Sequence, residues 1–345
     1  MVETTFFCKI CNVNHQKDSE VGKEHYKKLS LPEPGILKRA QEDCINILNE
    51  VSKKIVGQKE PLKQLLIGIL RDGNVLLEGY PGMAKTLMVK TLSDVMDLSF
   101  SRIQNTPDLM PSDITGTYII KETRDEKTFE FYKGPIFANV ILADEINRAT
   151  PKTQAAFLEA MQERQVTAGN KTFQLPNPFF VLATQNPIEQ EGTFPLPEAQ
   201  TDRFMFKTLV EYPNFEDENE IVDRFTTDVE PDFGLKKVIS VDRILHLQEL
   251  TRKVPIANDI KEYAIKIVEA TRKNKYIQYG ASPRASIFIV LAAKAKALIE
   301  GRSFVSEKDI QAMAYPILRH RIILAFEAEK QGKTTDEVIK TIVGD

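Results

Sequence analysis

The segment Gly79-Tyr-Pro-Gly-Met-Ala-Lys-Thr86 constrains the fold of this chain more than any other. It follows an apolar run at 75–77 that predicts a buried strand, and it precedes a helical pattern over 86–97. Its spacing matches the P-loop G-x-x-x-x-G-K-[ST], with Ala84 in place of the last glycine. The amides of such a loop, together with the N-terminus of the following helix, bind phosphate oxygens. The sequence therefore predicts a nucleotide site on an α/β sheet.

Two side chains of this loop have predicted roles. Lys85 would reach the β- and γ-phosphates, and Thr86 would ligate Mg²⁺. The other predicted phosphate-binding positions are Gly79, Pro81, Gly82, Met83 and Ala84. We expect Ala84 to be tolerated only if the backbone there is not at positive φ. A Gly-Pro turn before an ordinary helix is the alternative, and the flanking strand and helix disfavour it.

Two further strand ends carry polar side chains. A buried strand over 139–143 delivers Asp144 and Glu145 to its carboxyl end, where open α/β sheets bind ligands. Asp144 would hold the metal, usually through water, and Glu145 would polarise the attacking water. A third strand over 179–183 leads to Asn186, which could orient that water against the γ-phosphate. Taken alone, each of these would be a surface acid or a turn former.

The alternation of strands and helices predicts an open, mostly parallel sheet with helices on both faces. Two inserts, at 116–132 and 165–174, alternate apolar and polar residues around a turn and predict hairpins. Beyond Tyr212 only helical patterns remain, which predicts an all-helical second domain. These patterns cover about 216–226, 242–253, 259–274, 284–299, 306–328 and 334–342. The expected divisions are an N-terminal extension (1–35), a nucleotide-binding core (36–212) and a helical domain (213–345).

Composition excludes several classes of protein. The 46 basic and 49 acidic residues give a net charge of -3, which is no signature of a dedicated nucleic-acid or membrane-surface binder. Three cysteines in 345 residues are too few for a disulfide scaffold. The longest apolar stretch, 287–293, is far shorter than the ~18 residues of a membrane span, and the N-terminus lacks a signal-peptide layout. We therefore predict a cytoplasmic protein with no membrane span.

Four longer motifs occur in a fixed order along the chain. They are GYPGMAKT, VILADEINRATPKTQAAFLEAMQE, FVLATQNPIEQEGTFPLPEAQTDRF and GASPRAS. Their order and intervals closely resemble the MoxR family of AAA+ ATPases over about residues 36–345. The resemblance implies an AAA+ P-loop αβα core and a helical lid with ATP between them.

The resemblance also implies residue roles. Val56, Gly57 and Gln58 match the segment near adenine, and Asn186 matches the sensor that reads the γ-phosphate. Arg203 matches the arginine finger that acts on ATP held by the neighbouring subunit. Arg284 matches the lid sensor that touches the γ-phosphate from within the same chain. Either Gln104 or Asn105, near a strand end, would restrain Glu145 as a switch, and the sequence does not choose between them.

Assembly and partners follow from the same resemblance. Family members form rings, commonly hexamers, and are thought to remodel protein clients as chaperone-like ATPases. Many act with partner proteins that carry a von Willebrand factor A domain. We therefore predict ATP and Mg²⁺ as ligands, self-assembly into a ring and a protein client.

The N-terminal extension carries a separate hypothesis. Cys8 and Cys11 form a Cys-x-x-Cys pair, and His15 and His25 follow, so four Zn²⁺ ligands are within reach along the chain. FFCKICNV with EHYKK looks somewhat like a small U1/matrin-type zinc finger, whose modules bind RNA, although its usual second histidine is absent. A reduced cysteine pair in a tail is the alternative. Cys44 lies on an apolar helix face and is expected in the core.

Two other functions compete with protein remodelling. One is a nucleotide-gated adaptor recruited through the N-terminal zinc module. The complete catalytic set, Glu145 and Arg203 together, argues against an adaptor. The other is nucleic-acid remodelling, which the mixed charges of the first hairpin disfavour because a phosphate-binding strip would be basic.

Overall fold

The computed structural model describes most of the chain. The described ranges are 5–8, 13–16, 34–122, 127–186, 193–226 and 232–344. The two N-terminal ranges are described by their backbone, in which β1 (Thr5–Cys8) pairs antiparallel with β2 (Val13–Gln16).

A five-stranded parallel sheet organises the molecule, in the order β11-β3-β10-β7-β4. Its strands are β3 (Val75–Glu78), β4 (Phe100–Gln104), β7 (Val140–Asp144), β10 (Phe180–Gln185) and β11 (Phe206–Leu209). Three of them match the predicted strands, so the parallel α/β sheet is confirmed. The sequence patterns missed β4 and β11, because both lie at the sheet edges and are short or partly exposed.

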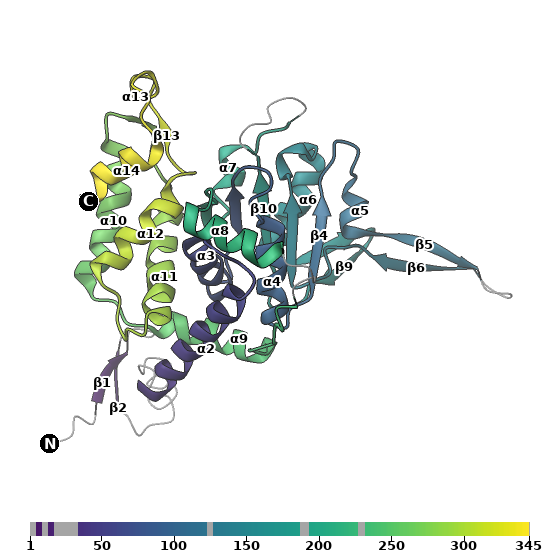
Figure 1. Ribbon diagram of the computed structural model, residues 1–345, viewed down its shortest axis with the longest axis horizontal. Helices are drawn as coiled ribbons and strands as arrows, with labels where there is room; N and C mark the ends of the chain where they lie inside the picture. Colours follow the sequence, from purple (N-terminus) through teal and green to yellow (C-terminus); the bar gives the residue numbers. More distant parts are fainter. Residues whose placement is uncertain are drawn as a thin grey trace.

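Helices cover both faces of this sheet (Figure 1). The core helices are α2 (Pro34–Ser52), α3 (Lys59–Leu70), α4 (Lys85–Val95), α5 (Pro111–Thr115), α6 (Pro151–Glu163) and α7 (Glu198–Thr201), with a 3-10 turn η1 (Ile146–Arg148). Successive strand side chains enter opposite layers: Leu76 and Ile141 pack with Phe157 of α6, whereas Val75 and Leu142 pack in the layer of α3 and α4. Because both faces are buried, the strands read as continuous apolar runs.

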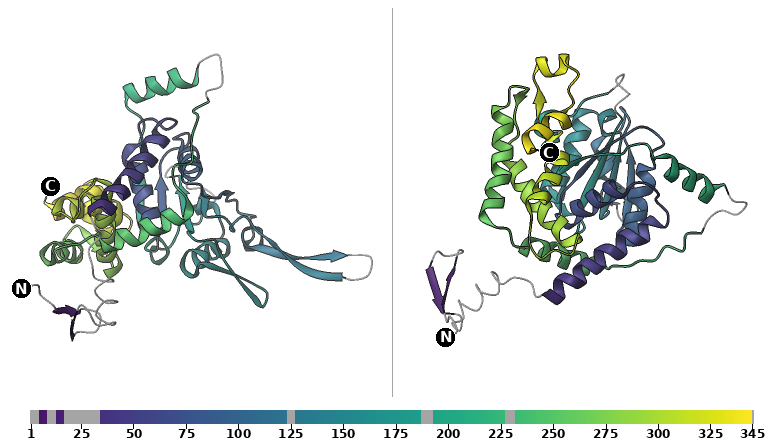
Figure 2. Two further views of the ribbon diagram at one scale, coloured as in Figure 1. Left: turned by 90° about the horizontal axis from the view of Figure 1, so that it is seen from below. Right: turned by 60° about the vertical axis from the view of Figure 1, so that its left-hand side comes forward.

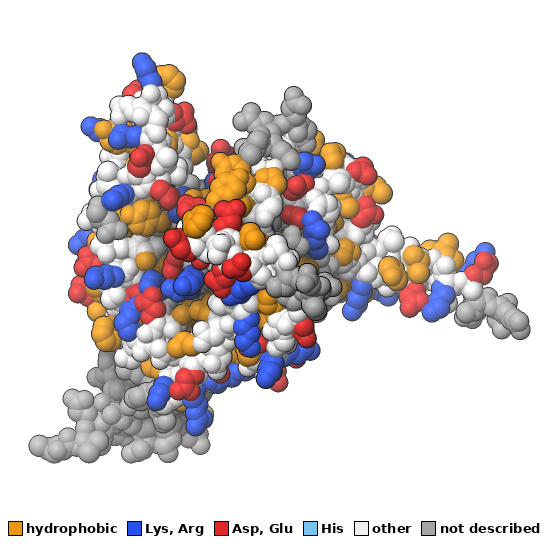
Figure 3. Space-filling model, viewed as in Figure 1, with side chains coloured by type: hydrophobic (Ala, Val, Ile, Leu, Met, Phe, Trp, Pro, Cys, Tyr) orange, Lys and Arg blue, Asp and Glu red, His pale blue; other side chains and the backbone are white. Residues whose placement is uncertain are grey.

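Two hairpins leave the body of the core, as predicted. One pairs β5 (Gly116–Glu122) with β6 (Lys127–Lys133), and the other pairs β8 (Gln165–Ala168) with β9 (Lys171–Gln174). The β5–β6 hairpin extends far beyond the rest of the molecule in Figure 1 and in the left view of Figure 2. Hydrophobic side chains are exposed along its length (Figure 3), among them Phe129 and Tyr132.

The predicted helical lid is confirmed, and two short strands join its helices. The helices that follow β11 are α8 (Phe215–Phe225), α9 (Val241–Lys253), α10 (Asn258–Lys273), α11 (Pro283–Ile299), α12 (Glu307–Leu318), α13 (Phe326–Lys330) and α14 (Thr335–Val343). The continuous helical pattern expected over 306–328 is wrong, because α12 ends at Leu318 and β13 (Ile323–Leu324) follows. This strand pairs antiparallel with β12 (Ile277–Tyr279). The pattern was misleading because a two-residue strand has no periodicity of its own.

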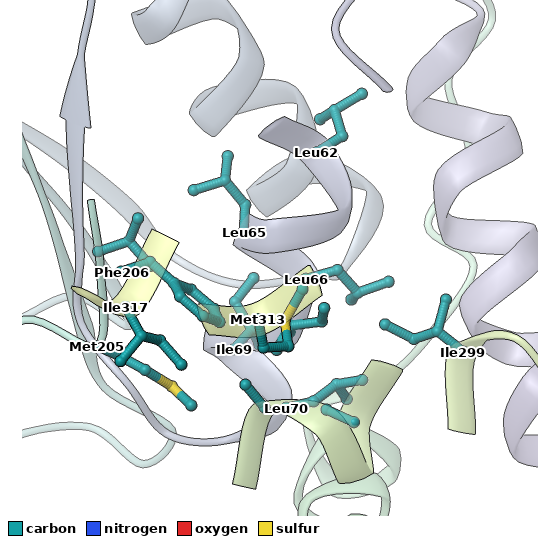
Figure 4. Packing of buried hydrophobic residues seen from close by; sticks show 14 of the residues in the cluster. Leu62, Leu65, Leu66, Ile69, Leu70, Met205, Phe206, Ile299, Met313 and Ile317 are labelled. Carbon is teal, nitrogen blue, oxygen red and sulfur yellow. The ribbon is translucent and has the colours of Figure 1, made fainter. Parts of the chain in front are cut away.

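The lid shares one apolar layer with the core. Leu62, Leu66 and Leu70 of α3 belong to the same buried hydrophobic cluster as Met313 and Ile317 of α12 (Figure 4). Cys44 of α2 is buried in the same layer, as predicted, and burial raises the pKa of its thiol to about 12. The lid is therefore seated on the core through side chains that are almost completely excluded from solvent.

Candidate functional site

The P-loop connects β3 to α4 at the carboxyl edge of the sheet. Gly82 has φ 81°, and Ala84 has φ 53° and ψ 22°. The expectation that Ala84 avoids positive φ is therefore wrong. A left-handed alanine costs about 1–2 kcal/mol, and the loop accepts this cost because left-handed turns converge backbone amides into an anion-binding nest.

Lys85 lies over the loop that it follows. Its Nζ donates to the carbonyls of Gly79 and Tyr80, the latter at 3.2 Å. Burial lowers the pKa of Lys85, and the nearby carboxylates of Asp144 and Glu145 oppose that shift. The ammonium is thus placed between the loop and the acidic pair, where a polyphosphate would need a positive charge.

Asp144 is held on both of its carboxylate oxygens. Thr184 Oγ1 donates to Asp144 Oδ1 at 2.6 Å, and Arg102 donates to Oδ2 from Nε at 3.0 Å and from Nη2 at 2.6 Å. Thr184 also accepts a bond from the Glu145 amide at 2.8 Å, which ties the end of β10 to the end of β7. Neither Arg102 nor Thr184 was predicted from the sequence, because a single arginine or threonine on a strand carries no motif.

The structure distinguishes the two switch candidates. Gln104 Nε2 donates to Glu145 Oε2 at 3.0 Å, and Arg148 Nε lies 3.1 Å from the same oxygen. Asn105 is fully buried, and its Nδ2 donates instead to the Asp144 carbonyl at 2.7 Å. Of the two candidates, Gln104 therefore contacts the Glu145 carboxylate, and Asn105 has a structural contact.

These groups surround one cavity of about 400 Å³. The lining residues are Pro81, Gly82, Met83, Ala84, Lys85, Thr86, Leu87, Arg102, Asp144, Glu145, Thr184, Gln185 and Asn186. Within the described ranges no group of three or more acids, cysteines or histidines is placed to hold a metal. One hydroxyl (Thr86) beside one carboxylate (Asp144) instead fits Mg²⁺, which keeps several waters and binds largely through substrate phosphates.

A second cavity of about 570 Å³ contains most of the segment assigned to adenine. Gly57 and Gln58 line it, and Gln58 Nε2 donates to the Glu211 carbonyl at 3.0 Å; Val56 is half-buried and is not among the lining residues. Tyr212 also lines this cavity and stacks on Tyr80 of the P-loop, with 5.3 Å between the ring centroids. The stack therefore connects a residue of the second cavity to the P-loop segment.

Arg284 is not among the residues that line the P-loop cavity. It begins α11, and its Nη1 donates to Asp202 Oδ2 at 2.8 Å, next to Arg203 in the chain. Arg284 therefore pairs with Asp202 in this structure, and its γ-phosphate contact stays a prediction. The reason lies in the path of the chain: α9 packs against α3 and α11, and α11 begins beside the 201–205 turn.

The predicted zinc ligands cannot be placed. Cys11 and His25 lie outside the described residues, and Cys8 and His15 belong to β1 and β2, of which only the backbone is described. Zinc binding thus stays a prediction. Among the helices of the described ranges, none has both the length and the apolarity that a membrane crossing requires.

A parallel sheet with a P-loop, a strand-end acidic pair and a helical lid defines an ATPase of the AAA+ class. The family model "ATPase family associated with various cellular activities (AAA)" matches residues 74–206, and the "AAA lid domain" model matches 269–342. Chaperone MoxR1 of Mycobacterium tuberculosis is 46% identical over 303 residues, which cover 85% of this chain and 78% of that protein. Protein MoxR of Methylorubrum extorquens is 31% identical over 304 residues, covering 80% and 86%.

A solved structure from Cytophaga hutchinsonii, whose description proposes an ATPase, has a TM-score of 0.83 at 45% identity. The match covers 94% of this chain and 98% of that one. The chain belongs to the MoxR family of AAA+ ATPases.

Proposed function

We propose that this protein hydrolyses ATP to ADP and phosphate in the P-loop cavity. The observation that carries the proposal is that one cavity brings together the P-loop, Asp144, Glu145 and Asn186. Lys85 would bind the β- and γ-phosphates, and Thr86 and Asp144 would hold Mg²⁺, which neutralises the phosphate charge when bound. Glu145 would accept a proton from the attacking water.

Turnover would need a neighbouring subunit. Arg203 and Arg284 flank Asp202, on a part of the molecule that does not line the cavity of their own chain. We propose that both arginines act on ATP held by the next subunit of a ring, a hexamer by analogy with the family. For Arg284 this replaces the within-chain contact that the resemblance implied.

The work of such a ring would be the remodelling of a protein client, and the MoxR1 relative is named a chaperone. Loss of the γ-phosphate would release contacts to Asn186 and to the neighbour's arginines, so hydrolysis would shift one subunit against the next. A partner with a von Willebrand factor A domain and a cytoplasmic location remain predictions from the resemblance.

Nucleic-acid remodelling has less support. The charges of the β5–β6 hairpin pair with one another, Lys121 with Glu130 at 3.0 Å and Lys127 with Glu122 at 2.7 Å. The described residues of the hairpin, 116–122 and 127–133, therefore show no uncompensated basic strip that would bind phosphates. A nucleic-acid or adaptor role would therefore depend on the zinc module predicted from Cys8, Cys11, His15 and His25.

The Glu145→Gln variant tests the proposed activity. The substitution keeps the size of the side chain and removes its basicity, so we expect ATP to bind with unchanged affinity and turnover to fall by about 10²–10⁴-fold. Glu159→Gln, at an exposed acid of α6, is the matched control and should leave turnover unchanged. Wild-type turnover by Glu145→Gln would remove Glu145 from the mechanism. The trapped ATP complex also provides the bait with which to capture the client.

A further inference from the structure

Arg321 joins the lid to the segment that carries Arg203. It lies in the turn after α12, and 1% of its side chain is exposed. Its Nε donates to Asp202 Oδ1 at 2.8 Å, and its Nη2 donates to the Asp202 carbonyl at 2.9 Å and to the Phe204 carbonyl. Its Nη1 donates to the Met205 carbonyl at 3.2 Å. One guanidinium thus binds the backbone on both sides of Arg203.

Neighbouring lid residues contact the same segment. His320 Nε2 lies 3.1 Å from the Phe204 carbonyl. The Asp202 carboxylate also accepts bonds from Arg284 at 2.8 Å and from Ser282 Oγ at 3.2 Å. Within the described ranges, by contrast, the Arg203 side chain makes no hydrogen bond or ion pair. The backbone around Arg203 is therefore fixed while its side chain is left available.

Packing alone does not hold Asp202 in the turn formed by residues 201–205. A cavity of about 440 Å³ opens there, lined by Asp202, His320 and Arg321 among others. Phe204 is fully buried in the core and anchors the other side of the turn. Because the Asp202 side faces a cavity, the position of its backbone depends on the lid contacts of Arg321.

We propose that Arg321 is a positioning residue for the arginine finger: the lid holds Arg203 in the orientation that reaches the neighbour's nucleotide. The inference rests on the proposed action of Arg203 across the subunit boundary. It assigns the lid a second task, which is to present the finger to the next subunit. A displacement of about 1 Å in a catalytic group can lower the rate about 10²-fold, so a small shift of this turn would be enough.

Arg321→Lys is the variant that tests this proposal. It keeps the positive charge beside Asp202 and loses the planar fork that reaches the carbonyls of Asp202, Phe204 and Met205. We expect unchanged ATP affinity with about 100-fold lower turnover. Arg302→Lys is the matched control, because Arg302 makes a comparable lid ion pair with buried Asp309 and has no contact with residues 202–205. The control should keep wild-type turnover.

Mixed rings locate the defect. Lys85→Ala subunits, which should bind ATP poorly but carry an intact Arg203, are mixed with Arg321→Lys subunits. We expect turnover per Arg321→Lys subunit to recover at least about tenfold, because its own site is intact and its neighbour now supplies the finger. Arg203→Ala subunits mixed in the same way test the proposed function itself.

The outcomes separate the two ideas. If Arg203→Ala is rescued and Arg321→Lys is not, the lesion affects the variant's own site and the positioning role is wrong. If Arg203→Ala is not rescued, the action of Arg203 across the boundary fails, and the inference fails with it. Wild-type turnover by unmixed Arg321→Lys also overturns the inference.

Hydrogen exchange gives a readout that needs no ring. The amides of Phe204 and Met205 donate to the carbonyls of Thr201 and Asn74. They should exchange faster in Arg321→Lys and at the wild-type rate in Arg302→Lys. Should Arg321→Lys fail to fold, Asp202→Asn removes the same ion pair from the other side and should show the same faster exchange and the same rescue. Unchanged exchange in a folded variant would contradict the proposal.

Discussion

At the scale of single residues, two positions of the site have a backbone conformation that residues with side chains disfavour. Ala84 and Glu145 both have φ 53°, which side chains rarely adopt, and they lie at the loop and at the acidic strand end. Strain of this kind persists where surrounding contacts over-determine the backbone. Both positions are held by such contacts, since the carbonyl of Ala84, the N-cap residue of α4, accepts from the Met88 amide and the Glu145 amide donates to Thr184.

Ala84→Gly should therefore be neutral or stabilising. Glycine removes the left-handed penalty, which stabilises the folded state by about 1–2 kcal/mol. It also raises the entropy of the unfolded chain, which destabilises the folded state by about 0.4–1 kcal/mol. We expect the free energy of unfolding in urea to stay level or rise by up to about 1.6 kcal/mol. Ala84→Val, a branched residue at the same φ, should lower it. A destabilised glycine variant would mean that Ala84 makes contacts worth more than its strain.

Gln104→Ala should raise basal turnover. The variant removes the amide that donates to Glu145 and leaves Arg148 as its partner. One such hydrogen bond is worth about 1 kcal/mol, so we expect turnover of the isolated protein to rise about fivefold. Asn105→Ala, which breaks a buried contact to the Asp144 carbonyl, should instead lower stability. Unchanged turnover in Gln104→Ala would exclude a restraining role.

At the scale of elements, buried polar groups join the end of α12 to the segment before β11, and we call this contact the seam. His320 and Arg321 follow α12 and contact the carbonyls just before β11. Burial lowers the pKa of Arg321 to about 10, and Asp202 acts against that shift. Such a buried pair contributes little net stability, but removing one partner is strongly destabilising because the other charge stays buried without a partner. The pair therefore fixes the position of Asp202 relative to Arg321.

This seam predicts a dependence of stability on pH. Burial is the main cause that lowers the pKa of His320 well below its usual value of 6.5, so the folded chain keeps this ring neutral. Below about pH 6.5 the unfolded chain binds a proton that the folded chain does not, and stability falls by up to about 1.4 kcal/mol per pH unit. The free energy of unfolding should therefore decrease between pH 7 and 5.5. His320→Gln should show a smaller decrease, and an equal decrease would exclude this residue.

At the scale of the whole molecule, the proposed site is divided between subunits. The P-loop cavity lies on the core, whereas Arg203 and Arg284 meet at Asp202, on the seam between core and lid. A single chain would then hold ATP and hydrolyse it slowly. Assembly would control the rate, since the finger arrives only with a neighbour.

Arg203→Ala tests that division. The variant should bind ATP with nearly unchanged affinity and lose about 10³–10⁵-fold in turnover, which corresponds to roughly 4–7 kcal/mol of barrier. Nucleotide titration and steady-state hydrolysis on the same preparation measure both quantities. An equal loss of binding and turnover would assign Arg203 to its own chain's site.

The sequence by itself determined the parts of this protein that follow from local order. The P-loop, the acidic pair after β7 and both hairpins were predicted from spacing and periodicity, because each forms from residues adjacent in the chain. The MoxR family followed from the order of these motifs.

Only the tertiary structure decided which distant residues meet. It selected Gln104 over Asn105, placed Arg284 on Asp202, and brought Arg321 to a segment 119 residues earlier in the chain. It also placed Ala84 at positive φ. These outcomes depend on how the lid packs on α3 and on how strands are ordered across the sheet. Neither property leaves a periodic trace in the sequence.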